Sequence, residues 1–139
     1  MGGLFLAGRI LLGGYYLFSA FHHFTDVGAL AHHAAAAGVP APTAAVLVAG
    51  VLLAIAGVTF LLGAYPDVGV AALALFFIPV TVVMHAFWAD KNPMMRQMDL
   101  INFTKNVALL ASSLMFLAIP RPWPYSIERR ARFALRSPV

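Results

Sequence analysis

A few polar side chains interrupt two of the most apolar stretches of the sequence. His85 lies near the end of one stretch with Trp88 close behind it, and Asn102, Lys105 and Asn106 lie inside the next stretch. Imidazole, amide and ammonium groups all donate hydrogen bonds. The two carbonyls of a quinone headgroup need donors of this kind beside a surface that its lipid tail can reach. These residues therefore predict a site for a quinone-like headgroup.

A further candidate, His23, ends the first apolar stretch. If the apolar stretches alternate in direction, His23 and His85 share one membrane leaflet. Two histidines on different helices also make a b-type haem an alternative, although haem needs the pair at matched depth and no sequence feature demands that. A metal site is not expected, because His22 and His23 point about 100° apart on a helix and no HxxxH spacing occurs.

The same polar groups also suit a purely structural role. Asn102 and Asn106 can hydrogen-bond between helices, although such a bond contributes only about 0.6 kcal/mol on average within a membrane. Lys105 can extend its ammonium group toward the membrane surface. Both interpretations stay open at this point, because sequence alone does not show what these side chains contact.

Composition identifies the solvent around these residues as lipid. Of the 139 residues, 62% are hydrophobic and only 10% are charged, whereas a soluble domain carries about 25% charged residues. A membrane-spanning helix needs about 20 mostly apolar residues, and four stretches qualify: 4–24, 43–64, 69–88 and 98–119. We therefore predict an all-α fold, an integral membrane bundle of four helices, with membrane lipids around it and no nucleic-acid partner.

The segments between the apolar stretches complete the expected organisation. Residues 25–42 are alanine-rich and too polar to cross, so they predict a short interfacial helix between the first two spans. Residues 1–120 form one transmembrane domain, and residues 121–139 form a basic tail that can fold as an amphipathic helix on an anionic membrane surface. Five arginines follow the last span, at positions 121, 129, 130, 132 and 136. Their position predicts that both chain ends lie in the cytoplasm.

Arg9 is the charged residue inside the first span, at the end opposite the histidines. Asp67, in the turn before the third span, is its nearest plausible counter-ion, so we predict a structural Arg9–Asp67 ion pair. Gly50 and Gly57 in the second span offer a small-residue surface for close helix packing. The chain has no cysteine, which excludes disulfides and thiol redox chemistry by its own residues.

Several stretches together resemble the DoxX family of small four-helix membrane proteins. They are "GRILLGGYYLFSAFHHF" (8–24), residues 37–63, "VVMHAFW" (82–88) and "DLINFTKNVALLASSLMFLA" (99–118). The resemblance implies an up-and-down bundle in a prokaryotic inner membrane and a link to membrane oxidoreductases, such as thiosulfate:quinone oxidoreductase. Arg9, His85, Phe87, Trp88, Lys105 and Asn106 match the residues of the family pattern.

Two positions depart from that pattern. Leu53 stands where the family often has a carboxylate in the second span, and Ser19 with His22 and His23 stands where a glycine and a lysine are common. The missing carboxylate weakens the case for a proton relay. The histidines keep a hydrogen-bonding group that titrates near neutral pH.

The predicted function is that of an accessory membrane subunit of a quinone-linked oxidoreductase system, not catalytic alone and bound to a protein partner. The quinone-like headgroup would contact His23, His85, Trp88, Asn102, Lys105 and Asn106. The alternative is a structural or assembly subunit that docks a larger complex through its loops and basic tail. A small-molecule carrier is disfavoured, because so few charges lie within the membrane.

Overall fold

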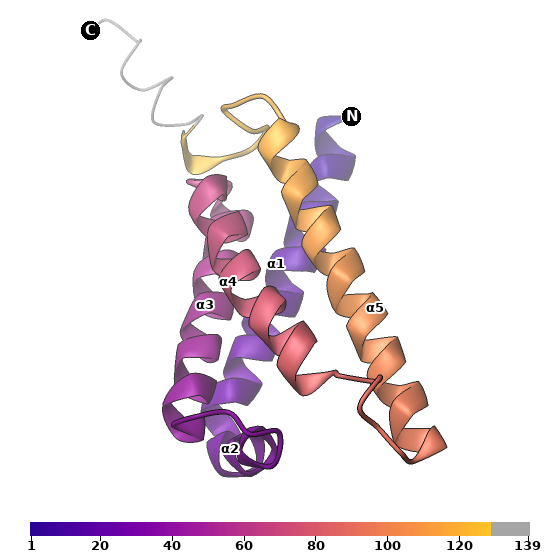
Figure 1. The fold of residues 1–139 in the computed structure, drawn as a ribbon. Helices are drawn as coiled ribbons and strands as arrows, with labels where there is room; N and C mark the ends of the chain where they lie inside the picture. Colours follow the sequence, from indigo (N-terminus) through magenta and orange to yellow (C-terminus); the bar gives the residue numbers. More distant parts are fainter. Residues whose placement is uncertain (129–139) are drawn as a thin grey trace, which may run out of the picture.

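Four long helices run up and down in the protein, and a short helix lies across one end of the bundle (Figure 1). The structure is a computed structural model, and it describes residues 1–128. Its elements are α1 (Gly2–Thr25), α2 (Val27–Ala36), α3 (Pro42–Leu62), α4 (Pro66–Met84), α5 (Pro93–Met115) and the 3-10 helix η1 (Phe116–Ala118). No strand occurs in this described part of the chain, so the predicted all-α four-helix architecture is confirmed.

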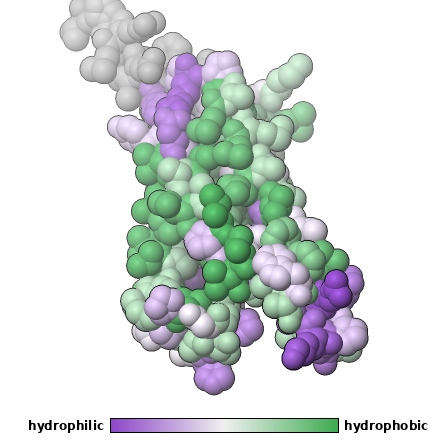
Figure 2. Space-filling model, in the orientation of Figure 1, coloured by the Kyte–Doolittle hydropathy of each residue, from purple (hydrophilic) through white to green (hydrophobic). Residues whose placement is uncertain are grey.

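The surface of the bundle matches a membrane environment. Helices α1, α3, α4 and the α5–η1 unit are each long and apolar enough to cross a bilayer. Figure 2 shows hydrophilic side chains gathered toward the two ends of the molecule, with a largely hydrophobic band between them. The predicted short helix is α2, which buries Ala31 and Ala34 while its two histidines are exposed.

Close contact between α1 and α3 depends on glycine. A Cβ atom on Gly57 would lie 2.7 Å from Leu17 Cγ and 2.9 Å from the Gly13 carbonyl oxygen. A Cβ atom on Gly13 would lie 2.7 Å from Leu61 Cγ. The two glycines therefore let the helix backbones approach, as the small residues of α3 predicted.

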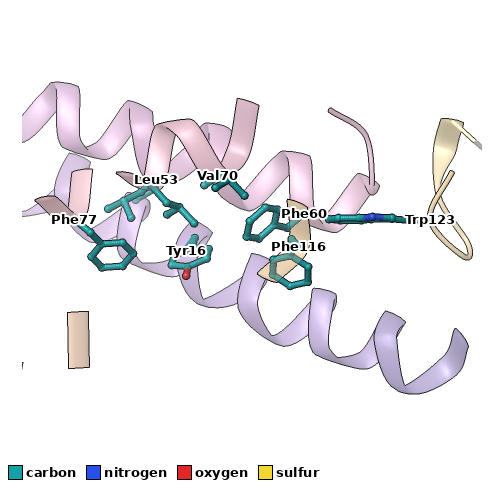
Figure 3. Packing of buried hydrophobic residues seen from close by; sticks show 10 residues of the cluster. Tyr16, Leu53, Phe60, Val70, Phe77, Phe116 and Trp123 are labelled. Atoms are coloured by element: carbon teal, nitrogen blue, oxygen red, sulfur yellow. The ribbon is translucent and has the colours of Figure 1, made fainter. Parts of the chain in front are cut away.

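A row of buried side chains forms the core along these helices (Figure 3). Tyr16 lies between Phe77 and Phe60, with its ring 6.2 Å from Phe77 and 6.0 Å from Phe60 between centroids. The row ends at Trp123, which is 1% exposed and packs against Phe116 at 5.3 Å and Phe5 at 5.1 Å. Aromatic packing of this kind stabilises the fold beyond the area it buries.

The domain boundary predicted at residue 120 falls within the folded part of the chain. The segment that follows η1 packs across the helix ends, with Trp123 and Ser126 both buried. Glu128 Oε1 accepts a hydrogen bond from the Tyr65 backbone N–H at 3.1 Å. Most of the predicted amphipathic helix, residues 129–139, lies outside the described residues.

Two helix ends also differ from the predicted spans, and both differences affect the site. Helix α4 ends at Met84, so His85 and Trp88 lie in the loop that follows and not on a helical face. Helix α5 begins at Pro93, five residues before the predicted start of the span at 98, because Asn92 caps it. The Asn92 side chain accepts hydrogen bonds from the N–H groups of Met94 and Met95 at 2.9 and 3.3 Å, and proline suits the first helical position.

Candidate functional site

The loop between α4 and α5 brings a histidine and a carboxylate together. His85 Nδ1 lies 3.0 Å from Asp99 Oδ1, and the two side chains are only 19% and 21% exposed. Because the carboxylate only accepts hydrogen bonds, Nδ1 carries the proton in this contact. The bond fixes the orientation of the imidazole and leaves Nε2 without a hydrogen-bond partner within residues 1–128.

A second carboxylate, Asp90, lies near the first in the loop between α4 and α5. Its Oδ2 atom is shielded from solvent and has no hydrogen-bond partner in the described part of the chain. Burial, a hydrogen bond with Asp99 and the negative charge of Asp99 all raise the pKa of Asp90 above its ordinary value. A raised pKa of this origin disfavours the charged form of Asp90.

Aromatic rings cover the same loop. The Phe87 ring packs edge-on against Trp88 at 5.1 Å and against Phe103 of α5 at 5.4 Å, and Trp88 lies 5.8 Å from Phe103. Trp88 is 55% exposed. An exposed indole beside half-buried rings is typical of the membrane–water boundary, where Trp is enriched.

The polar residues of α5 form one stripe that faces the bundle. Asn106 is 6% exposed, Ser113 is fully buried, and Asn102 and Asp99 are half-buried. The stripe meets α1 where the Tyr16 hydroxyl lies 3.1 Å from Ser113 Oγ. Helices α1 and α5 therefore share a buried polar contact at this pair.

Lys105 lies beside this stripe and is exposed. Its ammonium group donates to Asn102 Oδ1 at 2.9 Å, within one turn of the same helix. The pair places a positive charge and an amide on α5 one to two turns beyond Asp99. Lys105 makes no ion pair with a carboxylate of residues 1–128, so two of its three N–H donors are free for other groups.

His23 lies apart from these residues. Its Nδ1 lies 2.8 Å from the Ser19 carbonyl oxygen of its own helix, and its ring packs edge-on against Phe76 at 5.9 Å. Phe76 lies eight residues before Met84, where α4 ends, which is about 12 Å of helical rise before the His85 loop begins. Of the six predicted site residues, the structure gathers His85, Trp88, Asn102, Lys105 and Asn106 along α5 and its preceding loop, and it gives His23 other contacts.

The predicted ion pair between Arg9 and Asp67 is wrong, because both residues have other partners. Asp67 lies in the first turn of α4, is 60% exposed, and pairs with Arg121. Arg9 is 1% exposed, and its guanidinium donates to the carbonyls of Phe60 at 3.0 Å, Leu61 at 3.1 Å and Pro124 at 2.9 Å.

These acceptors explain why a buried arginine is stable at this position. The last four carbonyls of a helix lack partners within that helix, and α3 ends at Leu62. Arg9 also lies 5.8 Å from the Phe5 ring centroid and 5.6 Å from that of Trp123. Gly63 leaves the room required, since its Cβ would lie 2.6 Å from the Arg9 Nη1 atom. The guanidinium thus joins α1, the end of α3 and the segment after η1.

Asp90 and Asp99 are the site residues that the spacing of polar side chains did not identify. Asp99 falls at the start of the span predicted from residue 98, so no partner on the preceding segment was assigned to it. The sequence Asn92–Pro93 was the available signal, because asparagine before proline is a helix start. A helix starting there places Asp99, Asn102 and Asn106 on one face.

The described residues contain no group of three or more His, Cys, Asp or Glu side chains arranged to hold a metal ion. The arrangement that they do contain is a histidine fixed by one carboxylate, Asp99, with an amide, an ammonium group and aromatic rings nearby. Chemically, it can donate and accept hydrogen bonds at the end of an apolar bundle.

Comparison with known proteins places the chain in a family. No match was found among curated proteins or among solved structures. The sequence pattern of the DoxX family matches residues 4–86, which include all but the first two residues of α1, the whole of α2, α3 and α4, and His85. Since this match covers more than half of the 139 residues, the chain is a membrane protein that belongs to the DoxX family.

Proposed function

We propose that this DoxX protein is an accessory membrane subunit of an oxidoreductase system, and that the loop between α4 and α5 holds a quinone headgroup. The observation that carries the proposal is the His85–Asp99 contact of 3.0 Å. It holds the imidazole in one orientation with Nε2 unoccupied. A neutral imidazole accepts the hydroxyl proton of a quinol at Nε2, and an imidazolium donates to a quinone carbonyl there.

The surroundings supply what the rest of the headgroup needs. Lys105 and Asn102 provide further donors on α5, and Trp88 and Phe103 provide aromatic faces. Residues 91–98 at the start of α5 are all exposed, and Figure 1 shows this end of α5 standing away from α2 and α3. An isoprenoid tail could therefore lie along α5 in lipid. His23 is not part of the proposed site.

The proposal includes an orientation. The end of the bundle that carries Arg9 and Arg121 faces the cytoplasm, following the positive-inside bias of the last segment. The His85 loop then lies at the outer face of a prokaryotic inner membrane, and electrons pass between the bound quinone and a protein partner.

Equilibrium binding of decylubiquinone to the purified protein in lipid nanodiscs tests this function. We expect His85→Ala and Lys105→Ala each to weaken binding about tenfold to a hundredfold, since hydrogen bonds to charged groups contribute about 1.5–3 kcal/mol. The matched control is His22→Ala, which removes a histidine with the same 3.0 Å bond to a carboxylate, Asp26, in an exposed position.

Binding that is equal in the three variants and the parent would contradict the proposal, as would absence of binding by the parent. A circular dichroism spectrum and a melting curve for each variant separate loss of the site from loss of the fold.

An assembly subunit is the second candidate, and the exposure of residues 91–98 favours it. On this view, the start of α5 contacts a partner protein. A truncation that tests the role of the tail in assembly should begin at residue 129, because removing residues from 121 onward also removes the buried Trp123. Loss of a co-purifying protein in that truncation or in Met94→Asp, with quinone binding unchanged, would support assembly.

A further inference from the structure

Three exposed methionines lie at the start of α5, outside the proposed headgroup site. Met94 is 74% exposed, Met95 46% and Met98 52%. Most other exposed large apolar side chains lie farther along the membrane-spanning helices, where lipid surrounds them. The environment of the three methionines therefore depends on how far the start of α5 extends from the bundle.

Helix α5 projects beyond the end of its neighbour α4. The 3.0 Å contact between His85 and Asp99 sets the end of α4 at the level of Asp99. Because α5 begins at Pro93, residues 93–98 extend past that level, as Figure 1 shows. The α5–η1 unit of 26 residues is about 39 Å long, which exceeds a hydrocarbon core of about 30 Å.

The membrane–water boundary lies close to the same level. Trp88 is typical of this boundary, and its ring lies 5.8 Å from the Phe103 ring of α5. Met94 precedes Phe103 by nine residues, which is about 13.5 Å of helical rise, or about 10 Å along the membrane normal at a tilt of 40°. The headgroup layer extends only about 5–7.5 Å beyond the hydrocarbon core on each side. Met94 therefore reaches the aqueous phase, where lipid does not cover it.

The exposed charges around these methionines are positive. Lys91 and Arg96 are both exposed, and neither pairs with a carboxylate within residues 1–128. Of the carboxylates nearby, Asp99 is bonded to His85, and the Oδ2 atom of Asp90 is shielded from solvent. The start of α5 therefore presents apolar thioether side chains together with two unpaired cations.

We propose that residues 91–98 form a docking surface for a protein in the aqueous phase at this end of the bundle, and that the docked surface of this partner is acidic around an apolar centre. Methionine side chains adapt to apolar surfaces of varied shape. Carboxylates of the partner pair with Lys91 and Arg96 and steer its approach. Anionic lipid headgroups fit the two cations but not Met94, which lies beyond their layer. The inference holds whether or not a quinone binds.

Site-specific photo-crosslinking in native membranes tests the docking surface. The photoreactive residue p-benzoylphenylalanine replaces Met94, and mass spectrometry identifies the crosslinked products. We expect one partner protein, crosslinked through a peptide rich in Asp and Glu. The matched control carries the same probe at Ile78, which is 57% exposed within the membrane-spanning helix α4 and should label lipid alone.

Charge reversal in the same assay tests the acidic character of the partner. Lys91→Glu combined with Arg96→Glu should lower the crosslinking yield by about tenfold or more, since like charges across an interface are strongly unfavourable. Lys91→Arg combined with Arg96→Lys keeps both charges and should keep the yield. Raising the salt from about 0.1 to 1 M shortens the Debye length from about 10 to 3 Å, so it should also lower the yield. Should the double reversal fail to fold, Arg96→Glu alone provides the same test.

Three results would overturn the docking surface: no crosslinked partner (label on lipid alone included), a crosslink to a second copy of this chain, or a yield unchanged by charge reversal. Decylubiquinone binding by the same variants separates this inference from the proposed function. Lys91 and Arg96 lie outside the headgroup site, so charge reversal should leave quinone binding unchanged while it removes the partner. Absence of quinone binding in the parent would contradict the proposed function and leave the docking surface standing.

Discussion

Replacing Arg9 by methionine tests the principal interaction that closes the Arg9 end of the bundle. Methionine keeps an unbranched side chain of similar length but removes the three donors to Phe60, Leu61 and Pro124. Each of these three carbonyl oxygens then loses a hydrogen bond in a region from which water is excluded. We expect the variant to be less stable and its segment after η1 to detach.

The size of the effect follows from the number of bonds. An interhelical hydrogen bond in a membrane contributes about 0.6 kcal/mol on average, and a bond from a charged donor in a soluble protein contributes about 1.5 kcal/mol or more. Three such bonds give a range of roughly 2–4.5 kcal/mol. The two aromatic rings beside the guanidinium favour the upper part of that range.

Tryptophan fluorescence during denaturation measures both the loss of stability and the detachment of the segment after η1. The chain has two tryptophans, so a Trp88→Phe background leaves Trp123 as the one reporter of the segment after η1. Its indole is 1% exposed, and Arg9→Met should shift its emission to longer wavelength and make it open to acrylamide quenching. Arg96→Met, which removes an exposed arginine at the other end, is the control. A loss below about 1 kcal/mol, equal to that of the control, would refute the role assigned to Arg9.

Three further changes have expected outcomes. Asp67→Asn breaks an exposed ion pair with Arg121 and should lower the free energy of unfolding by no more than about 1 kcal/mol in an equilibrium unfolding assay. A larger decrease would show that this pair is a structural contact. Gly57→Ala should destabilise the protein by about 1–3 kcal/mol in the same assay, because its Cβ would overlap Leu17. Gly14→Ala is the control and should not destabilise the protein, since nothing lies within 4 Å of a Cβ there. Equal effects of the two changes would contradict the close packing of α1 and α3. The raised pKa of Asp90 means that the folded state holds its proton more tightly than the unfolded state, so stability should fall as the pH rises from the ordinary aspartate range through that raised pKa. Melting curves should lose this fall in Asp90→Asn, and a pH profile that is the same in the variant and the parent would contradict the raised pKa of Asp90.

Much of the fold could be predicted because membrane helices have few alternatives. Long apolar stretches must satisfy their backbone hydrogen bonds internally, so their number and approximate limits follow from hydrophobicity alone. The small residues of α3 also indicated close packing, which the contact between Gly57 and Gly13 confirms. Helix ends were harder to predict, because hydrophobicity does not show which side chains cap a helix. The start of α5 at Pro93 depends on the Asn92 side chain.

Most residue types of the site could be predicted, but the contacts between them could not. His85 was placed on a helix, but it follows the end of α4 and meets Asp99. That contact depends on the path of the loop, which side-chain spacing cannot give. Arg9 was paired with a carboxylate because charge was the available guide. The carbonyls that it binds belong to backbone groups at the end of α3, which a sequence pattern of side chains does not reveal.

The most direct test of the central claim is photo-crosslinking with an azido-quinone in native membranes, followed by mass-spectrometric mapping of the labelled peptide. The account predicts label on residues 85–106 of the parent protein, reduced in His85→Ala and competed by excess unlabelled quinone. Label confined to α1, α2 or α3, or label that excess quinone does not displace, would contradict a quinone site at the His85 loop.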